Sequence, residues 1–188
     1  MLVALERILG LAQKLGAEYA DARYVSLTQE PVTLTSEGAP QASVSKSAGL
    51  GLRVLVDGAW GFCATPYLDP RSLEKTADEA VRIASASALY KMGDGVGLPP
   101  LEPLRARWQT PHRLDPLTVK LEDKVSLLSE VIAAAKKVPG VTRANASIMS
   151  FREDKEFMST DGRQIEQASI HSGASLSVTA RGEGEIGR

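Results

Sequence analysis

The residues of this 188-residue sequence that could do chemistry are few and scattered. Cys63 is the only cysteine, and a thiolate is a strong nucleophile, but it lies in an apolar stretch where a small buried hydrophobic residue is the better interpretation. Of the two histidines, we expect His112 at the surface and His171 facing solvent or hydrogen-bonded. Because His-Glu-x-x-His and paired-cysteine motifs are both absent, the sequence offers no ligand set for a metal ion.

Two further groups of residues resemble catalytic or phosphate-binding patterns. The carboxylates of Glu153, Asp154 and Glu156 are close in sequence, but a solvated turn explains them without acid–base chemistry. The segment Gly93–Gly97 is rich in glycine, yet it follows a predicted helix, whereas a phosphate-binding loop precedes one. We therefore predict no catalytic and no cofactor-binding residue in this chain.

Three residues are candidates for contact with a partner. Trp60 and Phe62 could form a binding platform, with packing in the core as the favoured alternative. Arg53 could stack on the ring of Phe62 or pair with a carboxylate across an interface. Arg53, Trp60 and Phe62 are therefore the candidate interface residues.

A predicted β-hairpin must position these three residues. The dipeptide Asp57-Gly58 stands between two β-prone apolar runs, which is typical of a type I′ turn. This turn places Arg53 opposite Phe62, with Trp60 on the same face. Both faces of the hairpin are largely apolar, so we expect cover on both sides, at least in part. The other face would carry Leu50, Leu52, Val54, Val56, Gly61 and Cys63.

The rest of the chain predicts an α+β fold, with a largely antiparallel sheet and helices packed on it. The spacing of apolar residues indicates helices over 2–16 and 121–138, and Asp69-Pro70 is typical of the start of another. We expect Pro31 to interrupt the first strand, and Gly61 to let a helix or strand come close. Strands are predicted over 19–28, 32–35, 41–47, 142–151, 156–160 and 164–180.

The domain organisation is predicted from an internal repeat. The halves 1–92 and 120–188 each suggest a helix followed by strand, strand, turn and strand, although antiparallel strands can resemble each other by chance. The segment 93–119 holds five prolines and three glycines, and we predict an ordered loop there. In the second half no strand is expected to return after Arg181. We therefore expect residues 1–188 to be the N-terminal domain of a longer protein.

Composition limits the class of protein. The formal net charge of −1 gives no electrostatic reason to expect a nucleic-acid partner. No apolar stretch approaches the length of a membrane span, and one cysteine fits a reducing compartment. We expect a soluble, cytoplasmic protein with no nucleic-acid partner and no contact with a membrane.

Several short motifs, in this order, resemble one family. They are Ala20–Arg23, Gly49–Val54, Asp57–Phe62, Asp115-Pro116 and Ser159–Gly162. Together they look like the N-terminal domain of the TldD/PmbA family, once called modulators of DNA gyrase. The Trp-Gly-Phe sequence of the hairpin looks more like the TldD branch than the PmbA (TldE) branch.

The resemblance implies a function that these residues alone do not indicate. The TldD branch consists of cytoplasmic zinc metalloproteases that cleave extended peptides, and it pairs with a PmbA (TldE)-type subunit or forms homodimers. Its zinc motif lies in a C-terminal domain that this sequence lacks, so no catalytic or metal-binding residue is expected here. This domain would then serve dimerisation and the peptide channel, with Arg53, Trp60 and Phe62 as candidate contacts.

One alternative comes from a different class of function. The chain could be a stand-alone protein-binding or adaptor module, with 93–119 and the hairpin face as its surface. The historical gyrase-modulator role would imply contact with DNA or topoisomerase. The net charge of −1 argues against contact with DNA.

Overall fold

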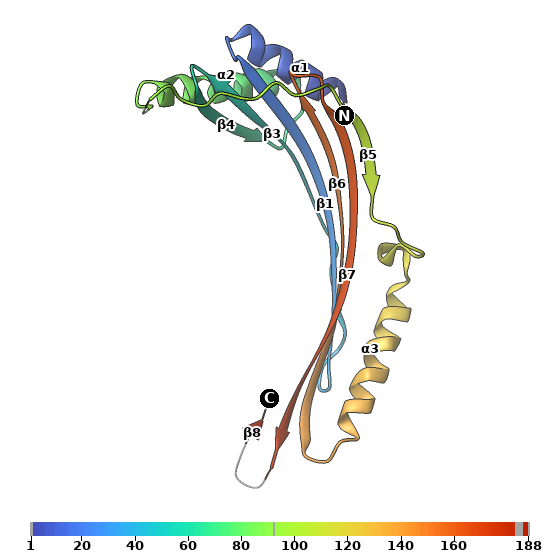
Figure 1. Ribbon diagram of the computed structural model, residues 1–188. Helices are drawn as coiled ribbons and strands as arrows, with labels where there is room; N and C mark the ends of the chain where they lie inside the picture. The colour runs from blue at the N-terminus through green and yellow to red at the C-terminus, as the bar shows by residue number, and fades with distance from the viewer. Residues whose placement is uncertain (1, 92, 183–185, 188) are drawn as a thin grey trace. The chain divides into compact units, whose positions relative to one another are not determined.

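The computed structural model describes residues 2–91, 93–182 and 186–187, the last two as backbone only. It confirms an α+β fold, in which an eight-stranded sheet has the order β4-β3-β1-β6-β7-β5, with β2 on β1 and β8 on β7 (Figure 1). The helices are α1 (Leu2–Lys14), α2 (Pro70–Ala88), the 3₁₀ turn η1 (Pro116–Thr118) and α3 (Leu121–Lys136). The strands are β1 (Tyr19–Thr35), β2 (Gln41–Ala42), β3 (Ser45–Val56), β4 (Ala59–Thr65), β5 (Arg105–Gln109), β6 (Val141–Ser159), β7 (Gln164–Arg181) and β8 (Ile186–Gly187).

The chain forms two compact units that interleave along the sequence. The first unit comprises residues 1–26, 47–109 and 153–168, and the second comprises 27–46, 110–152 and 169–188. The long strands β1, β6 and β7 contribute residues to both units. These units do not coincide with the predicted halves 1–92 and 120–188, and the internal repeat stays a prediction.

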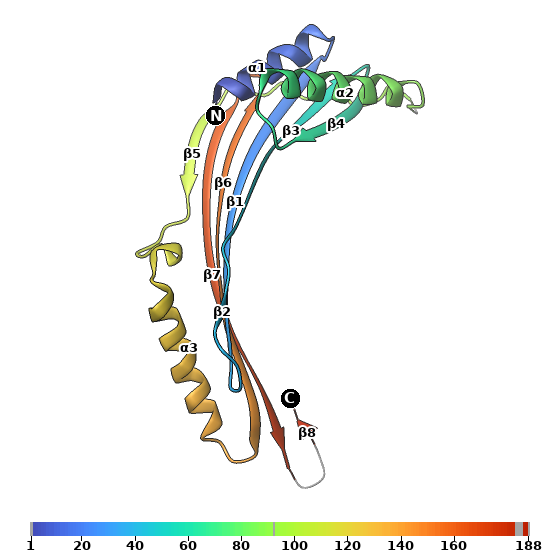
Figure 2. The ribbon, with the colours of Figure 1, turned by 180° about the vertical axis from the view of Figure 1, so that it is seen from behind.

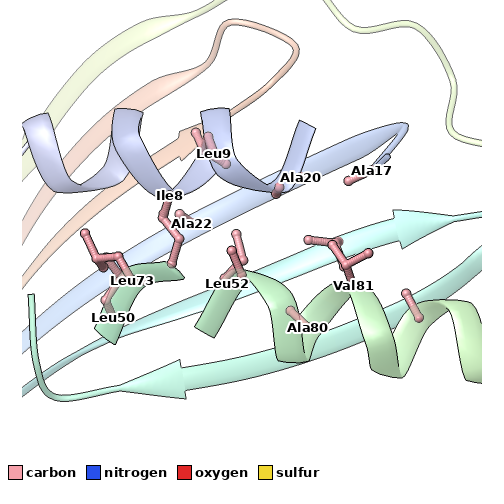
Figure 3. Close-up of a cluster of buried hydrophobic side chains, with 14 of the residues drawn as sticks. Ile8, Leu9, Ala17, Ala20, Ala22, Leu50, Leu52, Leu73, Ala80 and Val81 are labelled. Atoms are coloured by element: carbon pink, nitrogen blue, oxygen red, sulfur yellow. The ribbon is translucent and has the colours of Figure 1, made fainter. Parts of the chain in front are cut away.

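The core of the first unit lies between the sheet and two helices. Helices α1 and α2 lie side by side on one face of the strands. Figure 3 shows the apolar side chains that both helices and the strands contribute to this core. Ala20 and Ala22 of β1 alternate toward this core, as do Leu50, Leu52 and Val54 of β3. The core is aliphatic, and its small alanines let the helices approach the strands closely.

The hairpin of β3 and β4 has the predicted register at every position. Arg53 pairs with Phe62 and Leu55 with Trp60. Asp57 and Gly58 have φ angles of 46° and 70°, as a type I′ turn requires. One face of the hairpin packs into the helical core, whereas the Phe62 side chain on the other face is 59% exposed. The second face is therefore covered only in part, as expected, since Leu55 on it is buried.

Gly61 makes the close approach of α2 possible. A methyl group at this position would lie 2.1 Å from the carbonyl oxygen of Ala80, which is far inside van der Waals contact. Helix α2 begins where predicted, because Oδ1 of Asp69 accepts a hydrogen bond from the N–H of Ser72 (3.1 Å) and Pro70 follows the cap. Hydrogen bonds from the Ser72 hydroxyl and N–H lower the pKa of Asp69.

The second unit has its own core beneath α3, which runs along the strands (Figure 2). Leu128 and Ile132 of α3 pack against Val32, Leu34, Ala144 and Ala146. Lys124 of the same helix is buried and forms an ion pair with Glu30. A buried ammonium group needs such a partner, so this pair anchors the start of α3.

The structure differs from the sequence-based expectations along the long strands. Strand β1 continues through Pro31, whose carbonyl accepts a hydrogen bond from the N–H of Ser43 (3.3 Å) beside the short strand β2. Glu153, Asp154 and Glu156 lie inside the single strand β6, so the predicted turn is wrong. Neighbours in a polar strand alternate between its two faces, which separates Glu153 from Asp154.

Two strands were not expected. β5 lies inside the predicted loop 93–119 and pairs in parallel with residues 164–168 of β7. β8 pairs antiparallel with residues 180–181 of β7, so the expectation that no strand returns after Arg181 is wrong. The connection over 183–185 lies outside the described residues.

Candidate functional site

The sheet face opposite α1 and α2 gathers charged and aromatic side chains in the first unit. Because Ala20 and Ala22 of β1 point into the helical core, the alternate residues Tyr19, Asp21 and Arg23 project from the opposite face. The same alternation places Arg53 of β3, Trp60 of β4 and Phe157 of β6 on that face.

An ion pair and a ring contact hold the centre of this face. Nε and Nη2 of Arg53 donate to Oδ2 of the buried Asp21, at 2.9 and 2.6 Å. The same guanidinium lies over the ring of Trp60, with 4.5 Å between Cζ and the ring centroid. Tyr19 meets Trp60 edge to face, with ring centroids 5.9 Å apart. These contacts fix the Arg53 side chain, of which 51% stays exposed.

A second arginine and the β6–β7 turn complete the site. The Arg23 guanidinium lies 5.6 Å from the ring centroid of Phe157. Thr160 in the turn ties the turn to β1, because its hydroxyl accepts from the N–H of Ala20 (3.0 Å) and its own N–H donates to the carbonyl of Ala20 (2.9 Å). Nε of Arg163 lies 3.7 Å from Oδ2 of Asp161. The turn therefore presents one charge of each sign to the site.

These side chains line a cavity of about 580 Å³, bordered by the segment 96–101. The start of this segment is held on the hairpin turn, where the N–H of Val96 donates to the carbonyl of Gly58 (2.8 Å). A methyl group on Gly95 would lie 2.7 Å from the same carbonyl oxygen, so glycine is required for this contact. The glycine-rich stretch thus serves as a packing contact in this fold.

The structure brings two of the three candidate interface residues into the cavity. Arg53 and Trp60 line it, whereas Phe62 lies outside it with its ring over Gly51. The predicted stacking of Arg53 on Phe62 is wrong, because the guanidinium stacks on Trp60 instead. Packing in the core is also wrong for the exposed Phe62, and Trp60 is only partly buried.

Sequence reasoning missed most of the other charged residues of this site. Tyr19, Asp21 and Arg23 follow one another at every second position, which is a signal that was present in the sequence. Asp161 and Arg163 come from the β6–β7 turn, which reaches the site only through the pairing of distant strands. No local pattern indicates that pairing.

The phenol of Tyr19 should titrate above its ordinary range. Burial raises the pKa of Tyr19 above 10.0, and the negative charges of Asp21 and Asp161 raise it further. The raised pKa favours the folded state below pH 10, and this contribution is lost as the pH rises through the folded-state pKa. Ultraviolet titration should show that Tyr19 ionises above its ordinary range, and Asp21→Asn should move its pKa down. An unchanged titration curve in that variant would contradict the effect of Asp21 on the pKa of Tyr19.

The residues with metal-binding or nucleophilic chemistry lie apart from one another. Cys63 packs against the helical core, as predicted. His112 is exposed and its Nδ1–H donates to the carbonyl of Thr110 (2.8 Å), whereas the ring of His171 stacks on Phe151 at 4.7 Å. Within the described residues, no three His, Cys, Asp or Glu side chains gather as a metal site would require.

Among the helices of the described residues, none combines the length with the apolar character that a membrane crossing requires.

Two family models match most of the chain. The model of PmbA/TldA metallopeptidase domain 1 matches residues 20–84, and the model of the PmbA/TldA metallopeptidase central domain matches residues 114–188. Their order in the chain is that of a first domain followed by a central one.

Two curated relatives carry metalloprotease names. A metalloprotease of Methanothermobacter thermautotrophicus is 26% identical over 163 residues, which are 87% of this chain and 34% of that protein. A zinc metalloprotease TldD homolog of Saccharolobus solfataricus is 24% identical over 176 residues, which are 93% of this chain and 36% of that protein. The chain thus spans about a third of the length of these relatives.

Solved structures share the fold. A candidate modulator of DNA gyrase from Bacteroides thetaiotaomicron has a TM-score of 0.79 at 20% identity, over 98% of this chain and 42% of that chain. TldE from Thermococcus kodakarensis has a TM-score of 0.76 at 16% identity, over 97% of this chain and 40% of that chain. At these identities the likeness concerns the fold alone.

Proposed function

The chain belongs to the PmbA/TldA metallopeptidase family, and from that premise we propose that it is a non-catalytic part of a zinc metallopeptidase that processes extended peptides. The observation that carries this proposal is the consecutive match to the first and central domains of the family. The metalloprotease names of two relatives support it. In this proposal the chain contacts the peptide and the partner subunit, and chemistry takes place elsewhere.

The described residues do not fit a zinc site. Zinc in proteins takes three or four Cys, His or carboxylate ligands at about 2.0–2.3 Å, and no such group gathers in residues 2–91 and 93–182. The side chains of Cys63, His112 and His171 are each engaged with the core, a carbonyl or a ring. We therefore derive no catalytic step from this chain.

Zinc analysis and a cleavage assay test the non-catalytic role. The purified 188-residue chain is incubated with zinc, and free metal is then removed by dialysis. The chain should retain no stoichiometric zinc, and it should leave unfolded casein intact. The reason is that the described residues lack a ligand set. Stoichiometric zinc together with casein cleavage that a chelator abolishes would contradict the proposal.

We assign peptide contact to the sheet face opposite α1 and α2, which we call the open sheet face. Its exposed groups are the ring of Phe62, the guanidinium of Arg53 and the partly buried Trp60. Aromatic residues and arginine dominate the energetic centres of interfaces because they combine a large contact area with directed polar groups. The cavity beside them adds a concave site for a side chain.

The partner in this proposal is a subunit of the same fold. The structural likeness to TldE supports either a TldE-type subunit or a second copy of this chain. The net charge of −1 gives a DNA-binding role no support, although one structural neighbour is described as a gyrase modulator. The cytoplasmic location stays a prediction.

A further inference from the structure

We propose that the cavity on the open sheet face binds the carboxylate of a peptide, together with an adjacent apolar side chain. This inference rests on the proposed function in taking a peptide as the ligand. It goes further in naming the chemical group that the cavity recognises and the arginines that bind it.

Three arginines line the cavity, and each has donors that the described residues leave unused. Arg23 lies over the ring of Phe157 and has no carboxylate partner among the described residues. Nε of Arg163 is buried without a hydrogen bond, since the nearest oxygen of its ion pair is 3.7 Å away. Arg53 directs Nε and Nη2 to a single oxygen of Asp21, which leaves Nη1 available. A buried donor without a partner is costly, and a ligand oxygen would satisfy it.

The acidic groups nearby are occupied by donors of this chain. Asp21 is buried and binds Arg53, and Asp161 accepts a hydrogen bond from the Ser159 hydroxyl. Glu18 accepts a hydrogen bond from the N–H of Asp57 (2.9 Å). The three arginines and these three carboxylates balance in formal charge. The hydrogen-bond donors that lack a partner nevertheless belong to the arginines. The arrangement suits one singly charged planar anion, which a guanidinium binds through two parallel hydrogen bonds.

The remaining walls are apolar. Leu55, Trp60 and Phe157 lie on the sheet side, and Leu98 and Leu101 lie on the bordering segment. A volume of about 580 Å³ lies within the range of about 300–1,000 Å³ that is typical of small-ligand pockets. Such walls fit an apolar side chain next to the carboxylate. The carboxylate could be the C-terminus of a peptide or an internal Asp or Glu side chain.

Three short peptides distinguish these sources by fluorescence titration. The first ends in Leu-Leu with a free carboxylate, the second is its C-terminal amide, and the third is the amide with an internal Glu beside the leucines. Since Trp60 and Trp108 are the only tryptophans, a Trp108→Phe background makes the signal report on the cavity wall. At least one carboxylate peptide should bind about tenfold or more tightly than the plain amide, because charge-assisted hydrogen bonds are strong.

Variants assign this preference to the arginines. Arg23→Gln should remove most of the difference between the carboxylate peptides and the amide, and Arg163→Gln should reduce it. The matched control is Arg82→Gln, since Arg82 pairs with Glu79 on the surface of α2 and should leave binding unchanged. Thermal melts check that each variant folds.

The outcomes separate this inference from the proposed function. Equal binding of all three peptides would overturn the carboxylate inference and leave the peptide contact standing. Binding of none would overturn both. A preference for carboxylate that survives both Arg23→Gln and Arg163→Gln would also overturn the assignment to this cavity.

Discussion

Gly61→Ala is expected to destabilise the protein by about 3 kcal/mol, at the upper end of the usual range for overpacking. A methyl group at this position would lie 2.1 Å from the carbonyl oxygen of Ala80 and 2.6 Å from the nitrogen of Ala84. Both are backbone atoms of α2, so no rotation of a side chain relieves the clash. Helix α2 would have to move away from β4, and the core beneath it would loosen.

Urea unfolding followed by far-ultraviolet circular dichroism measures this loss. The control is Gly173→Ala, because Gly173 also lies in a strand but a methyl group there would meet nothing within 4 Å. The control should change the free energy of unfolding by less than about 1 kcal/mol, the usual scale for a residue that fits its strand. Equal effects of the two variants would contradict the close approach of α2.

Leu52→Ala is expected to cost about 3–4 kcal/mol, the middle of the range for leucine truncated in a core. Leu52 is 0% exposed and lies in β3 beneath α1 and α2 (Figure 3). Its removal would leave a cavity between two helices and a strand, which the small neighbouring alanines cannot fill. The same unfolding measurement, on the same chain, gives the loss.

The matched control for this truncation is a strand leucine on the surface. Leu176 of β7 is 50% exposed, so Leu176→Ala should cost well below half as much as Leu52→Ala. If both variants lose the same stability, β3 does not place Leu52 in the core. That result would also undermine the assignment of Arg53 to the opposite face.

Local signals in the sequence predicted the hairpin and the helices well. The Asp57-Gly58 turn sets the register of β3 and β4, because the side chains of a strand alternate with a period of two. Asp69 and Pro70 mark the start of α2 through the cap that the structure contains. In each case a few neighbouring residues carry the physical cause, so a single sequence suffices.

Long strands and distant pairings were beyond the sequence. A proline usually ends a strand, because it has no N–H to donate to a neighbouring strand. At Pro31 the neighbouring strand β2 is short, and the Pro31 carbonyl still accepts a hydrogen bond from the N–H of Ser43. Strand β5 has only five residues, all exposed, and it lies in a proline-rich segment, so its pairing with β7 defines it. Polar residues within β6 gave the appearance of a turn for the same reason, since its neighbours on the sheet determine its conformation.

The candidate site was predictable only where the hairpin supplies it. Arg53 and Trp60 were found because the turn fixes their shared face. Asp21 pairs with Arg53 because β1 lies beside β3 in the sheet. Arg163 and its partner Asp161 both come from the β6–β7 turn. The sequence thus predicted the correct face of the hairpin for Arg53, Trp60 and Phe62. It did not predict that Arg53 stacks on Trp60 and that the Phe62 ring is exposed.

The central claim is that the open sheet face of the first unit contacts extended polypeptide. The most direct measurement replaces Phe62 by the photo-crosslinking residue p-benzoylphenylalanine and irradiates the chain with unfolded casein. The control carries the same group in place of Val3, which is 77% exposed on α1. The account predicts casein adducts from position 62 well in excess of those from position 3. Equal labelling from both positions, or labelling from position 3 alone, would contradict it.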